Sequence, residues 1–149
     1  MTGGTVTRLR QALRLTVITD ATLAAPRPTR DVVAAALQAG ASTIQLRDKA
    51  ASARELAQQA HALLALTRAA GALLIINDRF DVALACTADG VHVGPHDIPV
   101  GALRAHAPRN FVIGASTDDP ERARSLELAG ADYLGCGAVF GTTTKDVGD

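Results

Sequence analysis

The chain has 149 residues, of which 48% are hydrophobic and 20% charged, and its 15 basic and 15 acidic side chains cancel to a formal net charge of zero. At this length a globular chain buries enough apolar surface to fold without disulfides or a structural metal. The balanced charge and an aromatic content of 3% argue against nucleic acid as a partner, because that needs a basic face and stacking side chains. We therefore expect a single domain over residues 1–149.

The ends and the cysteines point to a cytoplasmic protein. Residues 1–13 form a short polar lead, and no segment has the apolar length of a secretion signal or a membrane span. Cys86 and Cys136 do not form a C-x-x-C pair, so we expect reduced packing residues. These features predict a cytoplasmic location and no membrane partner.

In the first half of the chain, short β-branched runs alternate with longer segments of helical period, which predicts repeated βα units. Gly40 is placed to end the first long helix, and Ser52 with Glu55 forms a capping box at the start of the second. The predicted strands are 15–19, 43–46 and 73–76, and the predicted helices are 29–39, 52–70 and 80–86.

The second half repeats the same alternation. Pro120 stands at a first-turn position, which suits the start of a helix. The predicted strands are 90–93, 111–113 and 133–134, and the predicted helices are 100–106 and 120–129. The chain thus reads as about six strands with five complete helices.

Two architectures fit such repeats, an open doubly wound sheet and a (β/α)8 barrel. The turn after the first strand, residues 20–28, contains no G-x-G-x-x-G, which argues against a dinucleotide fold. Polar residues follow nearly every strand, and in barrels the active site is built at that rim. We therefore predict an α/β TIM barrel, incomplete here because strands seven and eight are lacking. The rim residues are Asp20, Arg47, Asp48, Lys49, Asn77, Asp78, Asp97, Ser116, Thr142, Thr144 and Lys145.

A cationic cluster follows the second predicted strand. Gln45 and Arg47 point the same way because side chains alternate along a strand, and Lys49 adds a mobile charge. A guanidinium and an ammonium directed at one place suit a phosphate or diphosphate. The alternative is that they form salt bridges with Asp48 or a neighbouring acid.

Two carboxylates follow the third and fourth predicted strands, Asp78 and Asp97. Two carboxylates from adjacent loops are the usual protein share of a Mg²⁺ site, which substrate phosphates and water complete. Alternatively, Asp78 caps the helix that begins beside it.

The remaining polar groups give weaker indications of a catalytic or metal-binding role. His92 lies in a strand and His96 in a loop, so their spacing does not predict a zinc site. Ser116 ends a strand with no histidine following it, which favours a hydrogen bond to substrate over a nucleophilic role. The glycine- and threonine-rich segment 135–145 can cradle an anion, with Lys145 balancing its charge.

Six segments carry a family resemblance. They are Val17-Ile18-Thr19-Asp20, Gln45-Leu46-Arg47-Asp48-Lys49, Ile75-Ile76-Asn77-Asp78-Arg79, Ala88-Asp89-Gly90-Val91-His92-Val93-Gly94, Ile113-Gly114-Ala115-Ser116, and Gly130-Ala131-Asp132-Tyr133 with Thr142-Thr143-Thr144-Lys145. In order and spacing these segments resemble the thiamine phosphate synthase family, from about residue 14 onward.

The resemblance implies a transferase that joins hydroxymethylpyrimidine diphosphate to a thiazole phosphate, giving thiamine phosphate and diphosphate. In this family the reaction is understood as dissociative, so that diphosphate departs before the thiazole nitrogen captures a pyrimidine methylene cation. No protein nucleophile is then required. Arg47, Lys49 and Lys145 would stabilise the charge that develops on the leaving oxygen.

The same resemblance assigns roles residue by residue, and the implied cofactor is Mg²⁺. Asp78 and Asp97 would be its ligands, and Thr142 and Thr144 would contact the thiazole phosphate. Asp48 and Thr143 belong to the same substrate-binding segments. The implied contacts of the pyrimidine diphosphate are Gln45, Arg47, Lys49, Asn77, Ser116 and Lys145.

The sequence departs from the family pattern in four places, which affects local loop shape. Pro95-His96 replaces the usual glutamine and acid, Asp118 stands where a histidine often follows the serine motif, and Ala138 and Gly141 replace two prolines. A complete barrel has roughly 200 to 250 residues, so we expect a truncated synthase that is weakly active or inactive alone. Its open edge strands would favour pairing with another chain, including as a homo-oligomer.

Two other functions stay open. A thiazole tautomerase of the same fold would need a general acid or base near the fifth strand, and Asp118 in place of histidine weakens that case. The chain could instead be a non-catalytic module that binds a phosphate compound. The expected partners in every case are small molecules.

Overall fold

The computed structural model describes residues 3–137, with side chains from residue 7 onward. The chain divides into two compact units, residues 1–91 and 92–149, and each is described by itself. Strand β4 (Gly90–Val93) contains the boundary between them.

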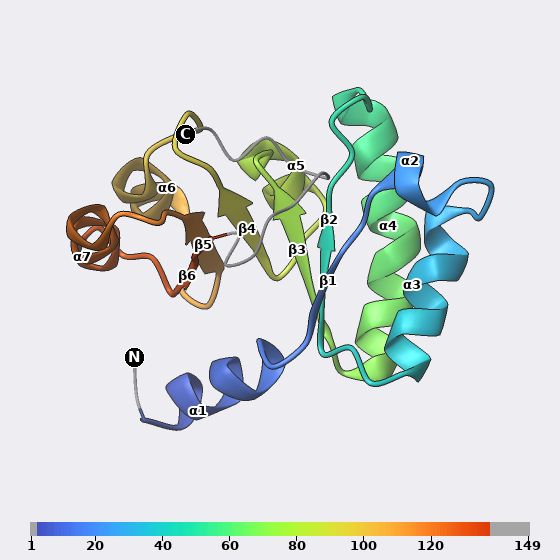
Figure 1. Ribbon diagram of the computed structural model, residues 1–149, viewed down its shortest axis with the longest axis horizontal. Helices are drawn as coiled ribbons and strands as arrows, with labels where there is room; N and C mark the ends of the chain where they lie inside the picture. Colours follow the sequence, from blue (N-terminus) through green and yellow to red (C-terminus); the bar gives the residue numbers. More distant parts are fainter. Residues whose placement is uncertain (1–2, 138–149) are drawn as a thin grey trace. The chain divides into compact units, whose positions relative to one another are not determined.

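The first unit is a layer of three parallel strands covered by helices (Figure 1). Strand β2 lies between β1 and β3, and Ile18, Gln45 and Ile75 stand side by side across the three strands. In Figure 1, helices α3 and α4 lie next to each other on one side of these strands. The elements are α1 (Gly3–Ala12), β1 (Thr16–Ile18), α2 (Ala21–Ala24), α3 (Thr29–Gln38), β2 (Thr43–Leu46), α4 (Ala53–Ala70), β3 (Leu73–Asn77) and α5 (Phe80–Ala85).

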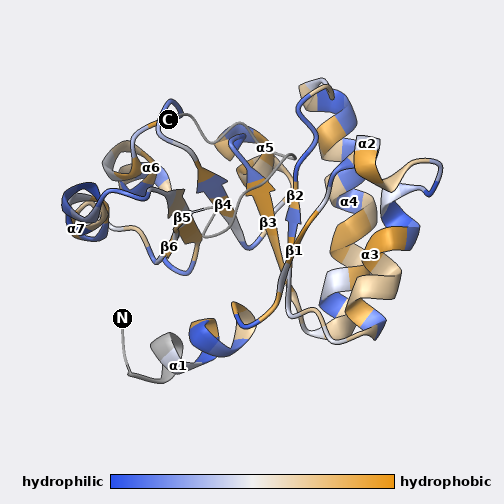
Figure 2. Cartoon of the chain, in the orientation of Figure 1, coloured by the Kyte–Doolittle hydropathy of each residue, from blue (hydrophilic) through white to orange (hydrophobic). Residues whose placement is uncertain are grey.

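The core of this unit comes from β2, β3 and one face of α4. Strand β3 is hydrophobic up to its last residue, Asn77 (Figure 2), as expected of a parallel strand covered on both faces. Helix α4 begins with the predicted capping box, in which Glu55 bonds both the backbone and the hydroxyl of Ser52, and these bonds lower the pKa of the Glu55 carboxyl. The buried residues are Ile44, Leu46, Leu56, Ala60, Leu63, Leu64, Leu74, Ile75 and Ile76.

The second unit repeats the pattern with α6 (Val100–His106), β5 (Val112–Ser116), α7 (Pro120–Leu128) and β6 (Tyr133–Gly135). Strands β5 and β6 are parallel, and Ser116 stands beside Gly135. The guanidinium of Arg104 donates to the carbonyls of Phe111 and Gly130 at 3.0 and 2.8 Å, which ties α6 to the loops that precede β5 and β6. Val100, Leu103, Ile113 and Ala115 are buried in this unit.

Four helices, α3, α4, α5 and α7, end in the same way. A residue with a left-handed backbone follows each helix, and the next residue is an alanine whose N–H bonds the carbonyl five residues earlier. This is the Schellman arrangement, which satisfies carbonyls at a helix end and turns the chain sharply. The left-handed residues are Gly40, Gly71, Thr87 and Gly130, and the alanines are Ala41, Ala72, Ala88 and Ala131.

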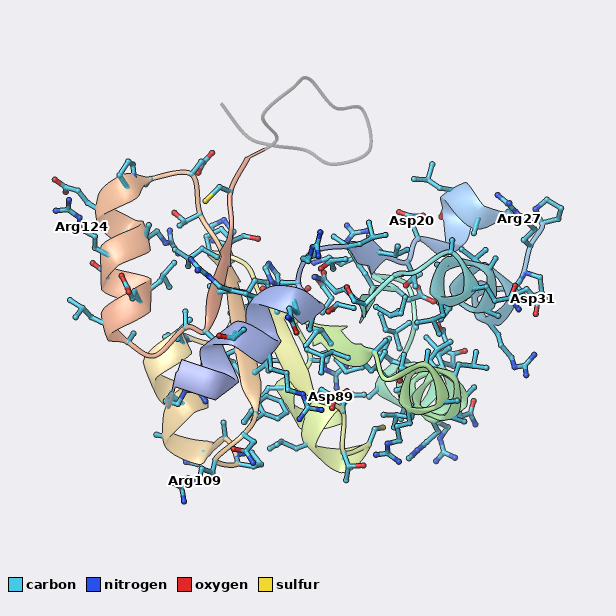
Figure 3. The ribbon with its side chains drawn as sticks, turned by 90° about the horizontal axis from the view of Figure 1, so that it is seen from below. Asp20, Arg27, Asp31, Asp89, Arg109 and Arg124 are labelled. Atoms are coloured by element: carbon cyan, nitrogen blue, oxygen red, sulfur yellow. The ribbon has the colours of Figure 1, made fainter. Side chains whose placement is uncertain are left out.

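A second repeated device fixes the start of a strand. The carboxylate of Asp89, labelled in Figure 3, accepts a 2.8 Å bond from the N–H of Leu74, the second residue of β3. Asp132 does the same for Ile113, the second residue of β5. In each unit, an aspartate that precedes one strand therefore bonds the start of the strand before it: Asp89 precedes β4 and bonds β3, and Asp132 precedes β6 and bonds β5.

The predicted strands and helices are confirmed with shifts of at most three residues at either end, but the structure adds two helices among the described residues. Residues expected as a lead form α1, whose end is held by a 2.7 Å bond from the Thr43 hydroxyl to the Ala12 carbonyl. That contact is tertiary, so local pattern does not reveal it. The other addition is α2, which Asp20 caps by accepting from the N–H groups of Thr22 and Leu23.

The cysteines and helix lengths complete the description. Both thiols are free, as expected, but only Cys86 is buried, whereas Cys136 is exposed and is not a packing residue. Burial raises the pKa of the Cys86 thiol. Within residues 3–137 no helix combines the length and apolar character needed to cross a membrane.

Candidate active site

The end of β2 is held in place by a buried threonine of the neighbouring chain segment. The backbone N–H of Arg47 donates to the Thr19 hydroxyl at 2.9 Å. The same hydroxyl donates to the Arg47 carbonyl at 3.1 Å. The Thr19 N–H donates to the carbonyl of Gln45, whose side chain is buried. The backbone of Arg47, which follows the last residue of β2, is therefore held in place by Thr19.

The Arg47 guanidinium faces an acid of the first unit. Its Nη1 lies 3.5 Å from Oδ2 of Asp20, which Figure 3 shows where the chain enters α2. The other carboxylate oxygen of Asp20 caps α2. The acid thus holds both a helix end and the cation predicted to bind phosphate.

Asp48 has a different set of contacts from its neighbours. Oδ1 accepts from the N–H groups of Ala50 and Ala51, each at 3.2 Å, and Oδ2 accepts from the Gln59 amide at 2.9 Å. Both oxygens are occupied by donors of the chain itself. Asp48 therefore shapes the loop that carries Lys49, and neither Arg47 nor Lys49 pairs with it.

Lys49 and Asp78 meet across the ends of β2 and β3. Their Nζ and Oδ2 atoms are 2.6 Å apart, and the lysine side chain is 62% exposed whereas the aspartate is 19% exposed. Asn77 is the last residue of β3, one position beyond the paired residues Leu46 and Ile76. The amide, the carboxylate and the ammonium that the sequence placed on this rim are therefore neighbours.

Asp78 does not cap the following helix. The cap position of α5 is Arg79, which makes no side-chain cap bond, and the Asp78 carboxylate contacts Lys49 instead. Asp78 has a left-handed backbone with φ of 62°, a conformation that few non-glycine residues adopt and that concentrates at functional sites. The alternative interpretation of Asp78 as a helix cap is wrong.

Asp97 belongs to the second unit, in the loop after β4. Its Oδ2 accepts a 2.7 Å bond from the N–H of Gly94. A Cβ at Gly94 would lie 3.3 Å from the same oxygen, so glycine lets the carboxylate close over the end of the strand. The predicted metal ligand is thus fixed by its own loop.

Ser116 ends β5 and lies against a histidine. Its Oγ is 2.8 Å from Nε2 of His92, and Nδ1 of the same ring is 3.0 Å from the hydroxyl of Tyr133. His92 is 8% exposed, and burial raises the pKa of the Tyr133 hydroxyl. As predicted, no histidine follows Ser116 in the sequence, and the histidine beside it comes from an earlier strand.

The second unit also contains a cavity beside Ser116, with a volume of about 310 Å³. Asp97 and Gly94 line it from the loop after β4, and Arg122 lines it from α7. The Arg122 guanidinium donates to the carbonyl of Pro95 at 3.1 Å. The cavity therefore brings a serine, a carboxylate and a cation together.

The predicted site residues divide into three groups. Gln45, Arg47, Asp48, Lys49, Asn77 and Asp78 belong to the first unit, and Asp97 and Ser116 to the second. Thr142, Thr143, Thr144 and Lys145 lie outside the described residues, as do Ala138 and Gly141.

Sequence reasoning missed Thr19, His92 and Tyr133 as site residues. The available signal was polarity inside apolar strands, because a polar side chain in a buried strand needs a hydrogen-bonding partner. His92 lies in a strand whose residues are all buried, and Thr19 is 4% exposed.

The sequence is similar to that of known proteins over most of its length. A family model described as thiamine monophosphate synthase matches residues 15–148. The chain is 46% identical over 130 residues to the thiamine-phosphate synthase of Natronomonas pharaonis, covering 87% of this chain and 61% of that protein. It is 52% identical over 118 residues to the thiamine-phosphate synthase of Chlorobium luteolum, covering 79% and 56%.

Solved structures agree. Thiamine phosphate pyrophosphorylase from Pyrococcus furiosus aligns with a TM-score of 0.84 at 47% identity, over 90% of this chain and 64% of that one. A mutant tryptophan synthase α-subunit from a hyperthermophile, Pyrococcus furiosus, aligns with a TM-score of 0.58 at 18% identity, which shows the fold alone. The likeness to the first structure confirms the predicted α/β fold of the TIM-barrel type.

The chain spans less than two thirds of the length of these relatives. Over that span the family model covers almost every residue, and the two curated relatives share about half of their aligned residues with it. The chain belongs to the thiamine monophosphate synthase family.

Proposed function

We propose that this chain is a thiamine phosphate synthase, which couples hydroxymethylpyrimidine diphosphate with a thiazole phosphate to give thiamine phosphate and diphosphate. The observation that carries the proposal is the pairing of Lys49 with Asp78 at the ends of β2 and β3. A cation and a carboxylate at adjacent strand ends are the two kinds of group that a diphosphate with Mg²⁺ requires.

The diphosphate would contact the cations of the first unit. Arg47 has a planar fork for two phosphate oxygens, and its 3.5 Å contact with Asp20 is a loose ion pair. Lys49 is largely exposed, and an exposed ion pair contributes only about 0–1 kcal/mol. Both cations can therefore exchange their acids for phosphate at little cost. The other proposed contacts of the pyrimidine diphosphate are Gln45, Asn77, Ser116 and Lys145. Thr142 and Thr144 would contact the thiazole phosphate, and Asp48 and Thr143 belong to the same substrate-binding segments.

Asp78 and Asp97, one in each unit, are proposed as the protein ligands of Mg²⁺. Among the described residues no group of three or more His, Cys, Asp or Glu could hold a metal, and Mg²⁺ needs only one or two carboxylates when phosphate and water complete its shell. The left-handed backbone of Asp78 and the Gly94 bond of Asp97 fix the two carboxylates at strand ends. When bound, Mg²⁺ would neutralise charge on the diphosphate.

The chain's own residues would act by electrostatics. As the bond between the pyrimidine methylene carbon and the diphosphate oxygen breaks, negative charge grows on that oxygen, and Arg47, Lys49 and Lys145 would stabilise it. The thiazole nitrogen then forms the new bond to the methylene carbon. No protein group forms a covalent bond or removes a proton in this scheme.

The test is product formation by the purified chain with both substrates and Mg²⁺. We expect thiamine phosphate to form at the low rate that the sequence predicts for this chain alone, and Asp78→Asn to lower that rate about 100-fold, the effect typical of losing one group that stabilises the transition-state charge. The matched control is Asp81→Asn, because Asp81 is an exposed acid that pairs with Arg79, which lowers the pKa of its carboxyl. Thiazole isomerisation without coupling would establish a tautomerase, and binding without turnover a phosphate-binding module.

A further inference from the structure

Three polar side chains form a continuous hydrogen-bonded chain in the second unit. Ser116 comes from β5, His92 from β4 and Tyr133 from β6. The Ser116 Oγ is 2.8 Å from Nε2 of His92, and the Tyr133 hydroxyl is 3.0 Å from Nδ1. The two rings also contact each other, with centroids 5.4 Å apart and planes tilted by 37°.

Glycines shape the space around these rings. A Cβ placed on Gly114 would overlap the Tyr133 ring, so the absence of a side chain there lets the ring lie over β5. A Cβ on Gly135 would lie 3.3 Å from Cε1 of His92. The positions of the hydroxyl and of the imidazole are thus set by packing on both sides.

The direction of the protons follows from the tyrosine. Desolvation raises the pKa of the half-buried Tyr133 hydroxyl, which therefore keeps its proton and can donate it. In residues 3–137 its hydrogen-bonding partner is His92 Nδ1. In the arrangement that we infer, the hydroxyl donates to this nitrogen, which then carries no proton, and the imidazole proton lies on Nε2.

This tautomer determines what Ser116 can do. Nε2–H donates to the serine oxygen, so His92 cannot accept the serine proton and Ser116 is not an activated nucleophile. The hydroxyl proton is directed away from the ring instead. Ser116 ends β5 and is only half-buried, so its proton can reach an acceptor atom of a bound ligand.

We propose that His92 and Tyr133 are positioning residues, which hold Ser116 as a hydrogen-bond donor to an acceptor atom of the bound pyrimidine diphosphate. The identity of that ligand rests on the proposed function. In this proposal Tyr133 donates to His92, His92 donates to Ser116, and Ser116 donates to the substrate. This order of donors does not depend on whether the chain turns the substrate over.

The first experiment measures the tautomer directly. In the ¹⁵N-labelled chain, at a pH where the histidines are neutral, the ring nitrogens of His92 are assigned by comparison with His92→Gln. We expect a protonated Nε2 and an unprotonated Nδ1, and a shift toward the other tautomer in Tyr133→Phe. A protonated Nδ1 in the unsubstituted chain would overturn the proposal, and the result is independent of activity.

The second experiment measures the dissociation constant of hydroxymethylpyrimidine diphosphate in the presence of Mg²⁺. We expect Ser116→Ala and His92→Phe to weaken binding about tenfold, the loss typical of one hydrogen bond to a charged or strongly polar group. His92→Gln retains an N–H near the Nε2 position and should recover most of that loss. His106→Gln is the control, because His106 is exposed and bonds a carbonyl of its own helix.

The outcomes separate the two claims. Weaker binding by His92→Phe and recovered affinity in His92→Gln support the positioning role. Glutamine has an N–H that can donate to Ser116 and phenylalanine has none, and a merely structural role would not distinguish the two. Equal binding by the unsubstituted chain and Ser116→Ala would overturn it. If the unsubstituted chain does not bind the pyrimidine diphosphate, the proposed function fails, and the tautomer measurement still decides whether Ser116 is held as a donor.

Discussion

Asp78 has two properties that a purely structural aspartate does not need, a left-handed backbone and a carboxylate paired with a largely exposed lysine. A helix cap would have explained the residue more simply, but the cap position of α5 is Arg79. The sequence placed Asp78 correctly at a strand end. It could not determine which of the two roles applied, because that depends on where the Lys49 side chain lies.

Lys49→Ala separates a binding role from a stabilising one. Because the lysine is 62% exposed, we expect the free energy of unfolding to change by less than about 1 kcal/mol, whereas the affinity for hydroxymethylpyrimidine diphosphate should fall at least about tenfold. Arg30→Ala, which removes another exposed ion pair of the first unit, is the control and should leave affinity unchanged. A large loss of stability with unchanged affinity would make the Lys49–Asp78 pair structural.

Gly114 and Gly101 offer a matched pair of substitutions in the second unit. A Cβ on Gly114 overlaps the Tyr133 ring, and overpacking of this kind costs about 1–3 kcal/mol. A Cβ on Gly101, inside α6, meets nothing within 4 Å, so alanine there should stabilise the chain by up to about 1 kcal/mol. Denaturant unfolding of both variants measures the difference, and equal effects would contradict the packing described for Tyr133.

Among the elements, the repeated helix ends show how far local pattern predicts the fold. Gly40 was recognised as a helix stop from sequence, and the capping box at Ser52 and the proline at the start of α7 are also local signals. Thr87 ends α5 with φ of 55°, a backbone that a β-branched residue rarely adopts, and no sequence rule points to it. Helix α1 and the short α2 depend on tertiary or loop contacts, which explains why they were not predicted.

Thr87→Gly tests the helix ends as a class. Glycine adopts the left-handed backbone without the penalty of about 1–2 kcal/mol that other residues incur, so we expect a gain of about 0.5–1 kcal/mol in the free energy of unfolding. The gain is smaller than the penalty because Arg68 donates to the Thr87 hydroxyl and carbonyl, at 3.2 and 3.4 Å, and the first of these bonds is lost. Gly71→Ala, at the end of α4 with φ of 66°, is the converse and should destabilise by about 1 kcal/mol. A destabilising Thr87→Gly would show that the Arg68 bond outweighs the backbone strain.

At the scale of the whole molecule, alternation of strands and helices was sufficient to predict the class of fold, because each βα unit has its own periodicity, caps and turns. The site was less accessible to prediction. Its charged strand-end residues are visible as motifs, whereas Thr19, His92 and Tyr133 gain their roles only through contacts between different strands. The roles of all the predicted site residues, residues 142–145 among them, stay predictions.

The central claim is that the ends of the strands bind a diphosphate together with Mg²⁺. Titration calorimetry of the chain with hydroxymethylpyrimidine diphosphate, with Mg²⁺ and then with a chelator, tests it directly. We expect Mg²⁺ to tighten binding at least about tenfold and Asp78→Asn to remove that gain, while Asp81→Asn retains it. Equal affinity with and without Mg²⁺, or full Mg²⁺ dependence in Asp78→Asn, would contradict the assignment of the site.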